Sequence, residues 1–212
     1  MTIRTLFAVV LSGVLYIPAS WGQSHIVRFN TNMGKMDVML FDETPAHRDL
    51  FLSQIRKGTY KGAEFNRVIK GFVSQGGELD EAILAREAAG ADRQRVPNEI
   101  ATKYCHEKGM LAAGRDDNAE KASYLSQIYL VQGHTYTDTQ LDSISAKRGM
   151  AISPERREIY RKVGGVPHLD GNYTIFGKII RGQHVADRIN AVRTNTHDKP
   201  IKPVVFDLEI IR

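Results

Sequence analysis

Short alternations of apolar and polar residues run through most of the chain and predict strands. Residues 26–29 and 35–41 alternate in this way on either side of a turn around Asn32 to Gly34, so they predict a hairpin. Further short strands are expected at the stretches FNRVIKGFVSQGG, KGMLAAGR, SQIYLVQG, YTIFGKIIRG and KPVVFDLEII. Several strands of this length are typical of an antiparallel barrel.

Other segments carry helix signals. Thr44 suits an N-cap, Pro45 suits the first helical position, and Gly58 suits the end of the same helix. A second main helix is expected over residues 184–192, and a short one over residues 81–89. The predicted fold is therefore mostly β with α, an antiparallel barrel capped by two helices.

The strand pattern stops between residues 133 and 167. Thr137 with Gln140 three residues later forms a capping-box pattern, and Ser153–Pro154 predicts a second helix start. Gly164–Gly165 predicts the end of that second helix. We expect an inserted helical hairpin here rather than a separate domain.

The composition is that of an ordinary globular protein. The 212 residues are 42% hydrophobic and 25% charged, which suits one domain. The net charge of +5 comes from scattered lysines and arginines, and without a basic stripe we expect no nucleic-acid partner. The seven histidines are dispersed, and the single cysteine, Cys105, has no ligand partner at a usual spacing. We therefore expect no metal and no cofactor.

The first residues have the features of a secretory signal peptide. Arg4 precedes an apolar run from Leu6 to Ile17, and the small residues Ser20 and Gly22 follow. We expect cleavage after Gly22, which leaves a mature domain over residues 23–212 that is periplasmic or secreted and does not span a membrane. The alternative is an uncleaved anchor, although the run is short for a membrane span.

The stretch FNRVIKGFVSQGG, which begins at Phe65, holds the candidate chemistry. Arg67, Val73 and Gln75 are of equal parity and are expected to share one face of a strand with Phe65. An arginine on an apolar face is costly unless it is hydrogen-bonded, and Gln75 is placed to hold it. One cation beside an apolar wall that includes Phe72 suits the binding of an uncharged group with a carbonyl. An arginine buried against a distant carboxylate is an equally good interpretation.

Several blocks give the chain a family resemblance. In order along residues 26–212, apart from the insertion, they are TPAHRDLFLSQIRKGTYKG, FNRVIKGFVSQGG, GMLAAGR, SQIYLVQG and HLDGNYTIFGKIIRG. They resemble blocks of the cyclophilins, which are peptidyl-prolyl cis-trans isomerases. The long polar segment before KGML and the helical insertion resemble features of some bacterial envelope cyclophilins.

The resemblance implies an eight-stranded antiparallel barrel closed by two helices, which isomerises X-Pro bonds in exported proteins during folding. Arg67 is then the catalytic arginine and Gln75 its support. The implied substrate-binding residues are Phe65, Phe72, Val73, Gly114, Arg115, Gln127, Tyr129, His168, Leu169 and Tyr173. Among them, Phe72, Val73, Tyr129 and Leu169 match the pocket for the proline ring, and Phe65 matches a nearby core aromatic.

Some positions depart from the family pattern. Leu125 replaces a usual glycine beside the groove, Ile128 replaces a core aromatic, and Tyr129 adds a hydroxyl to the pocket. A groove altered in this way also fits a second function, a chaperone or binding module that holds proline-containing segments with little turnover. His168 stands where many members have a tryptophan, so we expect the inhibitor cyclosporin to bind weakly.

Overall fold

The computed structural model describes residues 25–101 and 103–212, so the interpretation of residues 1–22 as a signal peptide lies outside the described residues. Within the described residues, nine strands form one antiparallel sheet in the order β3-β9-β1-β2-β8-β6-β7-β5-β4. The strands are β1 (Ile26–Thr31), β2 (Gly34–Leu40), β3 (Ala63–Glu64), β4 (Arg67–Val68), β5 (Val73–Gly76), β6 (Met110–Ala113), β7 (Ile128–Val131), β8 (Ile175–Arg181) and β9 (Val205–Ile210).

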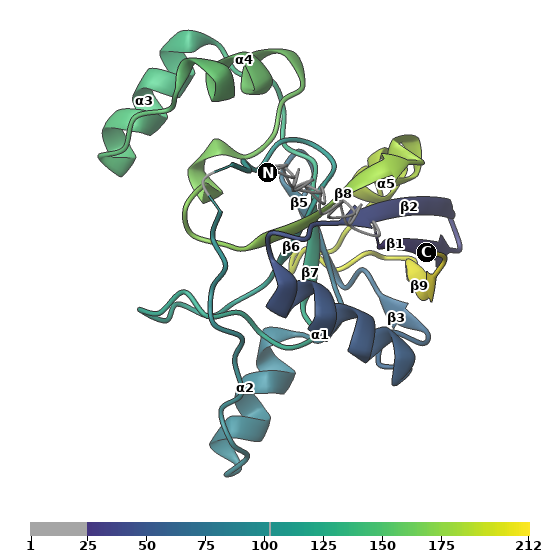
Figure 1. Ribbon diagram of the computed structural model, residues 1–212. Coiled ribbons are helices and arrows are strands. Elements are labelled where there is room, and N and C mark those ends of the chain that lie inside the picture. The colour runs from purple at the N-terminus through teal and green to yellow at the C-terminus, as the bar shows by residue number, and fades with distance from the viewer. Residues whose placement is uncertain (1–24, 102) are drawn as a thin grey trace, which may run out of the picture.

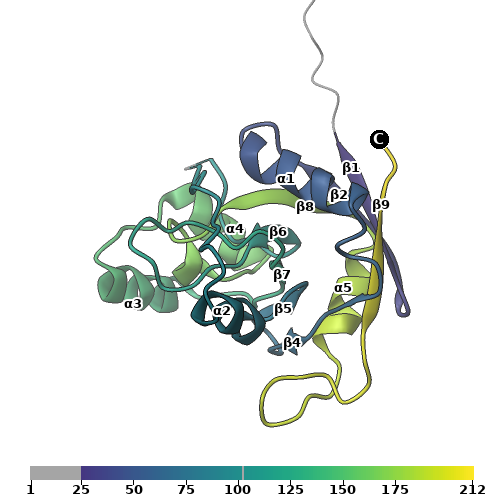
Figure 2. The same cartoon turned by 90° about the horizontal axis from the view of Figure 1, so that it is seen from below.

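The helices confirm the mixed composition of the fold. They are α1 (Pro45–Arg56), α2 (Asp80–Ala88), α3 (Asp138–Arg148), α4 (Pro154–Lys162), α5 (Gln183–Asn190) and a single 3-10 turn η1 (Pro167–Leu169). Figure 1 shows α2 and the α3–α4 pair standing out from the sheet. Helices α1 and α5 lie on opposite sides of the curled sheet (Figure 2). None of the helices in the described part of the chain is long and apolar enough to cross a membrane.

The sheet curls until its two edges meet. Its edge strands β3 and β4 are separated in sequence by Phe65 and Asn66 alone. The Asn66 side-chain amide donates to the carbonyl of Gly77 at 2.6 Å, and the Gly77 N–H donates to the carbonyl of Glu64 at 3.3 Å. These two bonds link Glu64 of β3 and Asn66 after it to Gly77, the residue that follows β5. Counted together, β3 and β4 form one interrupted strand, and the expected eight-stranded arrangement results.

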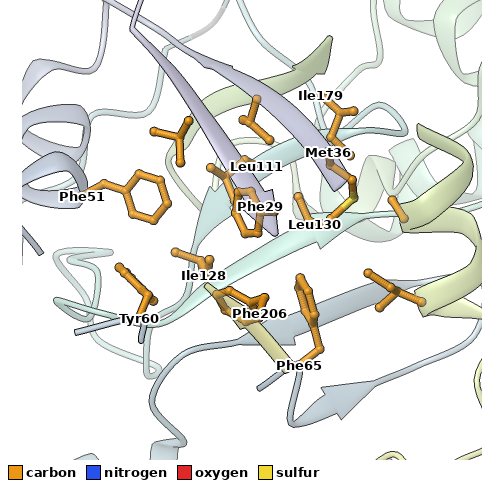
Figure 3. Close-up of a cluster of buried hydrophobic side chains, with 14 of the residues drawn as sticks. Phe29, Met36, Phe51, Tyr60, Phe65, Leu111, Ile128, Leu130, Ile179 and Phe206 are labelled. Atoms are coloured by element: carbon orange, nitrogen blue, oxygen red, sulfur yellow. The ribbon is translucent and has the colours of Figure 1, made fainter. Parts of the chain in front are cut away.

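Aromatic side chains fill the inside of the curl (Figure 3). The ring of Phe206 lies 4.7 Å from that of Phe65 and 5.5 Å from that of Phe29, measured between centroids. Ile128, which replaces a core aromatic of the family, is buried in the same cluster. Burying each of these side chains contributes about 1.5–3 kcal/mol, so this cluster is the main source of stability of the barrel.

The local signals placed α1 correctly but missed how it is capped. Thr44 is the N-cap residue and Pro45 begins the helix, as predicted, but the Thr44 side chain makes no capping hydrogen bond. Instead, the carboxylate of Glu99 accepts from the backbone N–H groups of Ala46 and His47, each at 2.9 Å. A carboxylate at a helix N-terminus is stabilising because it meets unpaired donors and the positive end of the helix dipole.

The insertion has the expected helices. The capping box between Thr137 and Gln140 is present at the start of α3, and the Ser153 hydroxyl accepts from a backbone N–H at the start of α4. Leu141 and Tyr160 are fully buried in a second cluster with Cys105, which lies before β6. Cys105 is a free, buried thiol, and burial raises its pKa to about 11. The hairpin is therefore packed against the barrel through this cluster.

Candidate active site

The stretch that holds Arg67 forms a tight hairpin instead of one continuous strand. Phe65 points into the barrel core, and Arg67 points outward at the start of β4, while Val68 returns to the core. The prediction that Phe65 and Arg67 share a face is therefore wrong, because the strand breaks between them at Asn66. Phe65 also lies outside the residues that line the pocket described below, so the structure places it in the core and not among the substrate contacts.

A β-turn brings Gln75 opposite Arg67. The Phe72 N–H donates to the Ile69 carbonyl at 3.0 Å, and Gly71 in this turn has a φ of +72°, which glycine adopts without strain. Asn190 of α5 holds the turn by accepting from the Gly71 N–H at 2.8 Å. The result is the cross-strand pair Arg67–Gln75 in the β4–β5 ladder.

The Arg67 side chain lies beside a carboxylate. Its Nε atom lies 3.8 Å from a carboxylate oxygen of Asp198, and the two side chains are 42% and 43% exposed. Asp198 is itself fixed, because its carbonyl accepts from the Val68 N–H at 2.8 Å. Among the described residues no hydrogen bond joins the side chains of Arg67 and Gln75. The alternative interpretation therefore found the correct kind of partner, a distant carboxylate, but the arginine is half exposed and not buried.

A pocket of about 160 Å³ opens beside Arg67 on the outer face of the sheet. One part of its wall is apolar and aromatic, with Val73 and Tyr129 almost fully buried, and polar or charged side chains line the rest. The complete lining is Arg67, Phe72, Val73, Gln75, Asp80, Gly114, Arg115, Gln127, Tyr129, Leu169 and Tyr173. The structure thus brings together every residue of the predicted site except Phe65 and His168. The apolar part of the wall can hold a compact ring, while a neighbouring polar side chain such as Arg67 reaches a polar group attached to that ring.

The side of the pocket at β6 is closely fitted. A side chain at Gly114 would place its Cβ 1.9 Å from the Gln127 side-chain oxygen, so a larger residue here requires the Gln127 side chain to move. The Gly114 N–H already donates to the Gln127 carbonyl, and its carbonyl already accepts from the Tyr124 N–H. Arg115 covers the ring of Tyr173 at 4.8 Å. A substrate-binding role for Gly114 and Arg115 stays a prediction.

Asp80 is a pocket residue that the sequence did not single out. It lies at the start of α2, where its carboxylate accepts a hydrogen bond from the Gln127 side-chain amide. The same amide donates to the carbonyl of Glu78 at 3.0 Å. These two bonds fix the Gln127 side chain in the pocket wall. Asp80 lies in a polar segment with no recognisable motif, so no sequence signal pointed to it.

His168 and Leu125 lie beside the pocket. The imidazole of His168 stacks on the ring of Phe72, with centroids 5.5 Å apart. Burial lowers the pKa of His168, as does the nearby charge of Arg148. Leu125 lines a neighbouring hollow of about 260 Å³ against α2 and is absent from the pocket lining. Leu125 therefore does not narrow this pocket, although it replaces a usual glycine of the family pattern.

A buried group of polar side chains supports the pocket from behind. The Tyr129 hydroxyl lies 3.0 Å from Nε2 of His106, and Nδ1 of His106 lies 2.9 Å from the carboxylate of Asp170. Burial lowers the pKa of His106, so its imidazole is neutral at pH 7. No sequence pattern pointed to this group, because its members lie in three separate stretches of the chain.

Fold and site together define the class: a curled antiparallel barrel whose outer pocket is lined by an arginine and by aromatic and aliphatic side chains. The chain belongs to the cyclophilin-type peptidyl-prolyl cis-trans isomerases, since the model of that family matches residues 26–207. The family resemblance of the sequence is thereby confirmed.

Named relatives agree with this assignment. A peptidyl-prolyl cis-trans isomerase of Acinetobacter baylyi is 27% identical over 191 residues, which cover 90% of this chain and 84% of that protein. The isomerase CYP18-1 of Arabidopsis thaliana is 29% identical over 180 residues, which cover 84% of this chain and 90% of that protein. These identities extend over nearly the whole domain and not over single motifs.

Solved cyclophilins share the fold. A cyclophilin-type isomerase of Cryptosporidium parvum, crystallised in the presence of the dipeptide Ala-Pro, superposes with a TM-score of 0.64 at 22% identity. The alignment covers 88% of this chain and 99% of that one. The cyclophilin AquaCyp293 of Hirschia baltica superposes with a TM-score of 0.58 at 18% identity, over 88% of this chain and 73% of that one.

Proposed function

We propose that this cyclophilin accelerates rotation about X-Pro bonds in exported polypeptides as they fold, with Arg67 as its catalytic residue. The observation that carries the assignment is that Arg67 lines a pocket of about 160 Å³ whose wall also includes the apolar side chains Phe72, Val73 and Leu169. The pocket is of a size for one small ring. The structural relative crystallised in the presence of Ala-Pro supports a proline ring as the occupant.

The chemical problem is the partial double bond of the peptide group. Resonance sets a rotation barrier of about 18–20 kcal/mol, and an unassisted X-Pro bond takes tens to hundreds of seconds to isomerise. In the twisted transition state the resonance is lost, so the proline nitrogen becomes a better hydrogen-bond acceptor. A donor placed at that nitrogen therefore binds the transition state more strongly than either ground state, which is the condition for catalysis.

Arg67 is placed to be that donor. Its Nε atom lies 3.8 Å from Asp198, and Asn190 holds the turn that follows its strand, so we expect its two terminal nitrogens to reach the substrate. One positioned donor contributes about 3–4 kcal/mol to transition-state stabilisation. An acceleration of about 10⁵ requires about 7 kcal/mol. The pocket must therefore supply a comparable share by holding the ring while the other side of the bond turns.

The export of the protein is a second part of the proposal. It rests on the positive start, short apolar run and small residues of positions 1–22. Expression with and without these residues, followed by fractionation and mass measurement of the N-terminus, tests it. We expect the full chain to leave the cytoplasm and to begin at Gln23, whereas retention of Met1 in the cytoplasmic fraction would contradict export.

The experiment that tests the isomerase function is a protease-coupled assay on a short X-Pro peptide with the wild-type protein and Arg67→Ala. We expect wild-type acceleration and a loss of kcat/KM of at least about 10² in the variant, because one transition-state donor is removed. The ion pair of Arg67 with Asp198 is half exposed, so the circular dichroism spectrum and Tm should stay unchanged. Peptide binding without wild-type turnover would favour the alternative function, a proline-segment binding module.

A further inference from the structure

The insertion is joined to the proline pocket by a continuous chain of buried polar contacts. At the pocket end, Tyr129 is 4% exposed and its ring forms part of the pocket wall. At the far end, Tyr160 of α4 is fully buried among residues of the insertion. Between them stand His106 and Asp170, both buried. These four side chains connect a helix of the insertion to the wall of the pocket.

The direction of each hydrogen bond follows from the chemistry of its partners. Asp170 Oδ1 accepts from the backbone N–H of His106 at 2.8 Å and lies 2.9 Å from its Nδ1. A carboxylate accepts only, so Nδ1 is the protonated nitrogen of the neutral imidazole. Nε2 is then an acceptor, and the Tyr129 hydroxyl donates to it at 3.0 Å. The angular position of the Tyr129 hydroxyl is thus fixed by Asp170 through His106.

The insertion supplies the other contacts of Asp170. The Tyr160 hydroxyl donates to Asp170 Oδ2 at 2.8 Å, and a guanidinium nitrogen of Arg156 lies 3.5 Å from the same oxygen. From α3, Arg148 donates to the carbonyl of Pro167 at 2.9 Å and to that of Asp170. Pro167 begins η1, the turn that carries the pocket residue Leu169. Both helices of the hairpin therefore hold groups that set the pocket.

Two aromatic rings of the pocket wall, Tyr129 and Tyr173, contact each other, and both contact the ring of His106. The rings of Tyr129 and Tyr173 meet edge to face, 5.8 Å apart, and the His106 ring meets Tyr173 in the same way at 6.3 Å. Close-packed rings have little free volume, so a shift of His106 must move one wall or the other. A change at Asp170 is felt by two of the aromatic walls of the site.

We propose that Tyr160, Asp170 and His106 are positioning residues for the proline pocket, through which the helical insertion sets the Tyr129 ring. The proposal rests on the proposed function, because the pocket it concerns is the proposed substrate site. The proline ring occupies the pocket in the ground states as well as in the transition state. Loss of the chain of contacts should therefore weaken substrate binding and raise KM more than it lowers kcat.

The test compares Tyr160→Phe with Tyr136→Phe. Both changes remove one hydroxyl and keep the ring; Tyr160 belongs to the buried cluster, and Tyr136 is partly buried and packs against it. The Tyr136 ring packs edge to face on Tyr160, but its hydroxyl makes none of the side-chain hydrogen bonds of the described residues. We expect Tyr160→Phe to raise KM, and the Kd of an unlabelled X-Pro peptide measured by NMR titration, by about threefold to tenfold. Tyr136→Phe should leave both constants unchanged.

Adding Tyr129→Phe separates positioning from simple loss of stability. If Tyr160 acts mainly through the Tyr129 hydroxyl, Tyr160→Phe should raise KM less in the Tyr129→Phe background, where the contact of His106 with Tyr173 is the remaining route, than in the wild type. Effects that multiply in the double variant, or equal constants for Tyr160→Phe and Tyr136→Phe, would overturn the proposal. If Tyr160→Phe is insoluble, Arg156→Gln removes a contact to the same carboxylate oxygen and carries the same expectation.

The binding measurement keeps this proposal apart from the isomerase function. A wild-type protein that binds the peptide without turnover contradicts the proposed function, yet a higher Kd for Tyr160→Phe would still support the chain of contacts. A wild-type protein that turns over normally, with a Tyr160→Phe variant identical to it in both constants, contradicts the chain of contacts alone.

Discussion

Two buried histidines have the same order of partners and different consequences. His47 has the carboxylate of Glu99 at 2.6 Å from Nδ1 and the Ser123 hydroxyl at 3.0 Å from Nε2. His106 has the carboxylate of Asp170 on Nδ1 and the Tyr129 hydroxyl on Nε2. Each is an acid–histidine–hydroxyl series in which burial lowers the pKa of the imidazole. The difference lies in where the hydroxyl stands.

The His47 series is structural. Its order is that of a nucleophile–base–acid triad, but Ser123 is fully buried and its backbone pairs with Val96 through two bonds of 2.8 Å. No substrate can reach that hydroxyl. Glu99 also caps α1, so the series fastens the long polar segment to the first helix. By contrast, the hydroxyl of the His106 series belongs to a wall of the pocket beside Arg67. The same series of acid, histidine and hydroxyl is therefore expected to influence activity only where the residue that carries the hydroxyl lines the pocket, as Tyr129 does.

The largest effect on activity is expected from a change at Arg67. Arg67→Lys keeps the positive charge but loses the planar fork of donors, so we expect kcat/KM to fall by about 10². The change is measured in the protease-coupled assay beside wild type, with Tm as the control for folding. A Lys variant with near-wild-type activity would show that a positive charge at this position is sufficient for catalysis. The planar arrangement of donors would then not be required.

Cyclosporin binding tests the role of η1, the turn that carries His168 and accepts a hydrogen bond from Arg148. His168→Trp enlarges the aromatic surface beside Phe72, where the imidazole now stacks. A good aromatic anchor is worth about 2 kcal/mol, so cyclosporin should bind about 30-fold more tightly to the variant. Turnover should change less, because His168 does not line the pocket. Titration of both proteins with the drug decides the point, and equal inhibition constants would show that His168 contributes nothing to drug binding.

The direct comparison uses His47→Gln and His106→Gln. Each change breaks a buried hydrogen-bond series, so we expect each to lower the free energy of unfolding by about 1–3 kcal/mol. At a temperature where both stay folded, only His106→Gln should lower kcat/KM, by about tenfold. Urea unfolding and the peptide assay on the same samples provide both numbers. The contrast we draw fails if the two variants lose activity equally.

The smallest expected effect is a pH dependence that both histidines share. An unfolded histidine takes up a proton near pH 6.5, whereas burial lowers the pKa of His47 and His106 and keeps them neutral at lower pH. The unfolded state then binds more protons, so the free energy of unfolding falls as the pH drops below about 6.5. For each histidine the slope is at most about 1.4 kcal/mol per pH unit.

Neighbouring charged groups modify that titration. Hydrogen bonds to Glu99 and Asp170 oppose the lowering of the two pKa values, and for His106 the charges of Arg148 and Arg156 add to it. Urea titrations of wild type and both Gln variants between pH 7 and 5 should show a shallower slope in each variant. Identical slopes in all three proteins would mean that neither histidine is linked to unfolding in this range.

The sequence predicted those parts of the fold that depend on local signals. The first hairpin, α1, α5 and both helices of the insertion begin and end near the expected residues because caps, prolines and glycines act within one turn. The break at Asn66 was missed because strand parity assumes an uninterrupted ladder, whereas the side chain of Asn66 bonds across the closing edge. The break is a consequence of curling, which no local pattern records.

The candidate site was predicted through the family resemblance more than through its own residues. Ten of the pocket residues stood in matched motifs, whereas Asp80 and Asp198 stand in loops and helix starts with no motif. The His106 series could not be anticipated, because His106, Tyr129 and Asp170 become neighbours only when β7 and η1 are in place. Contacts between distant stretches of chain depend on tertiary packing, and one sequence does not encode them in a readable pattern.

We propose that X-Pro bonds isomerise in the pocket beside Arg67. Exchange NMR on an X-Pro peptide with a small amount of the protein tests it without a coupling protease, since cross-peaks between the cis and trans forms report rotation itself. We predict strong exchange with wild type and with His47→Gln, and an exchange rate lower by at least about 10² with Arg67→Ala. Undiminished exchange with Arg67→Ala, or no exchange with the wild-type protein, would contradict the account.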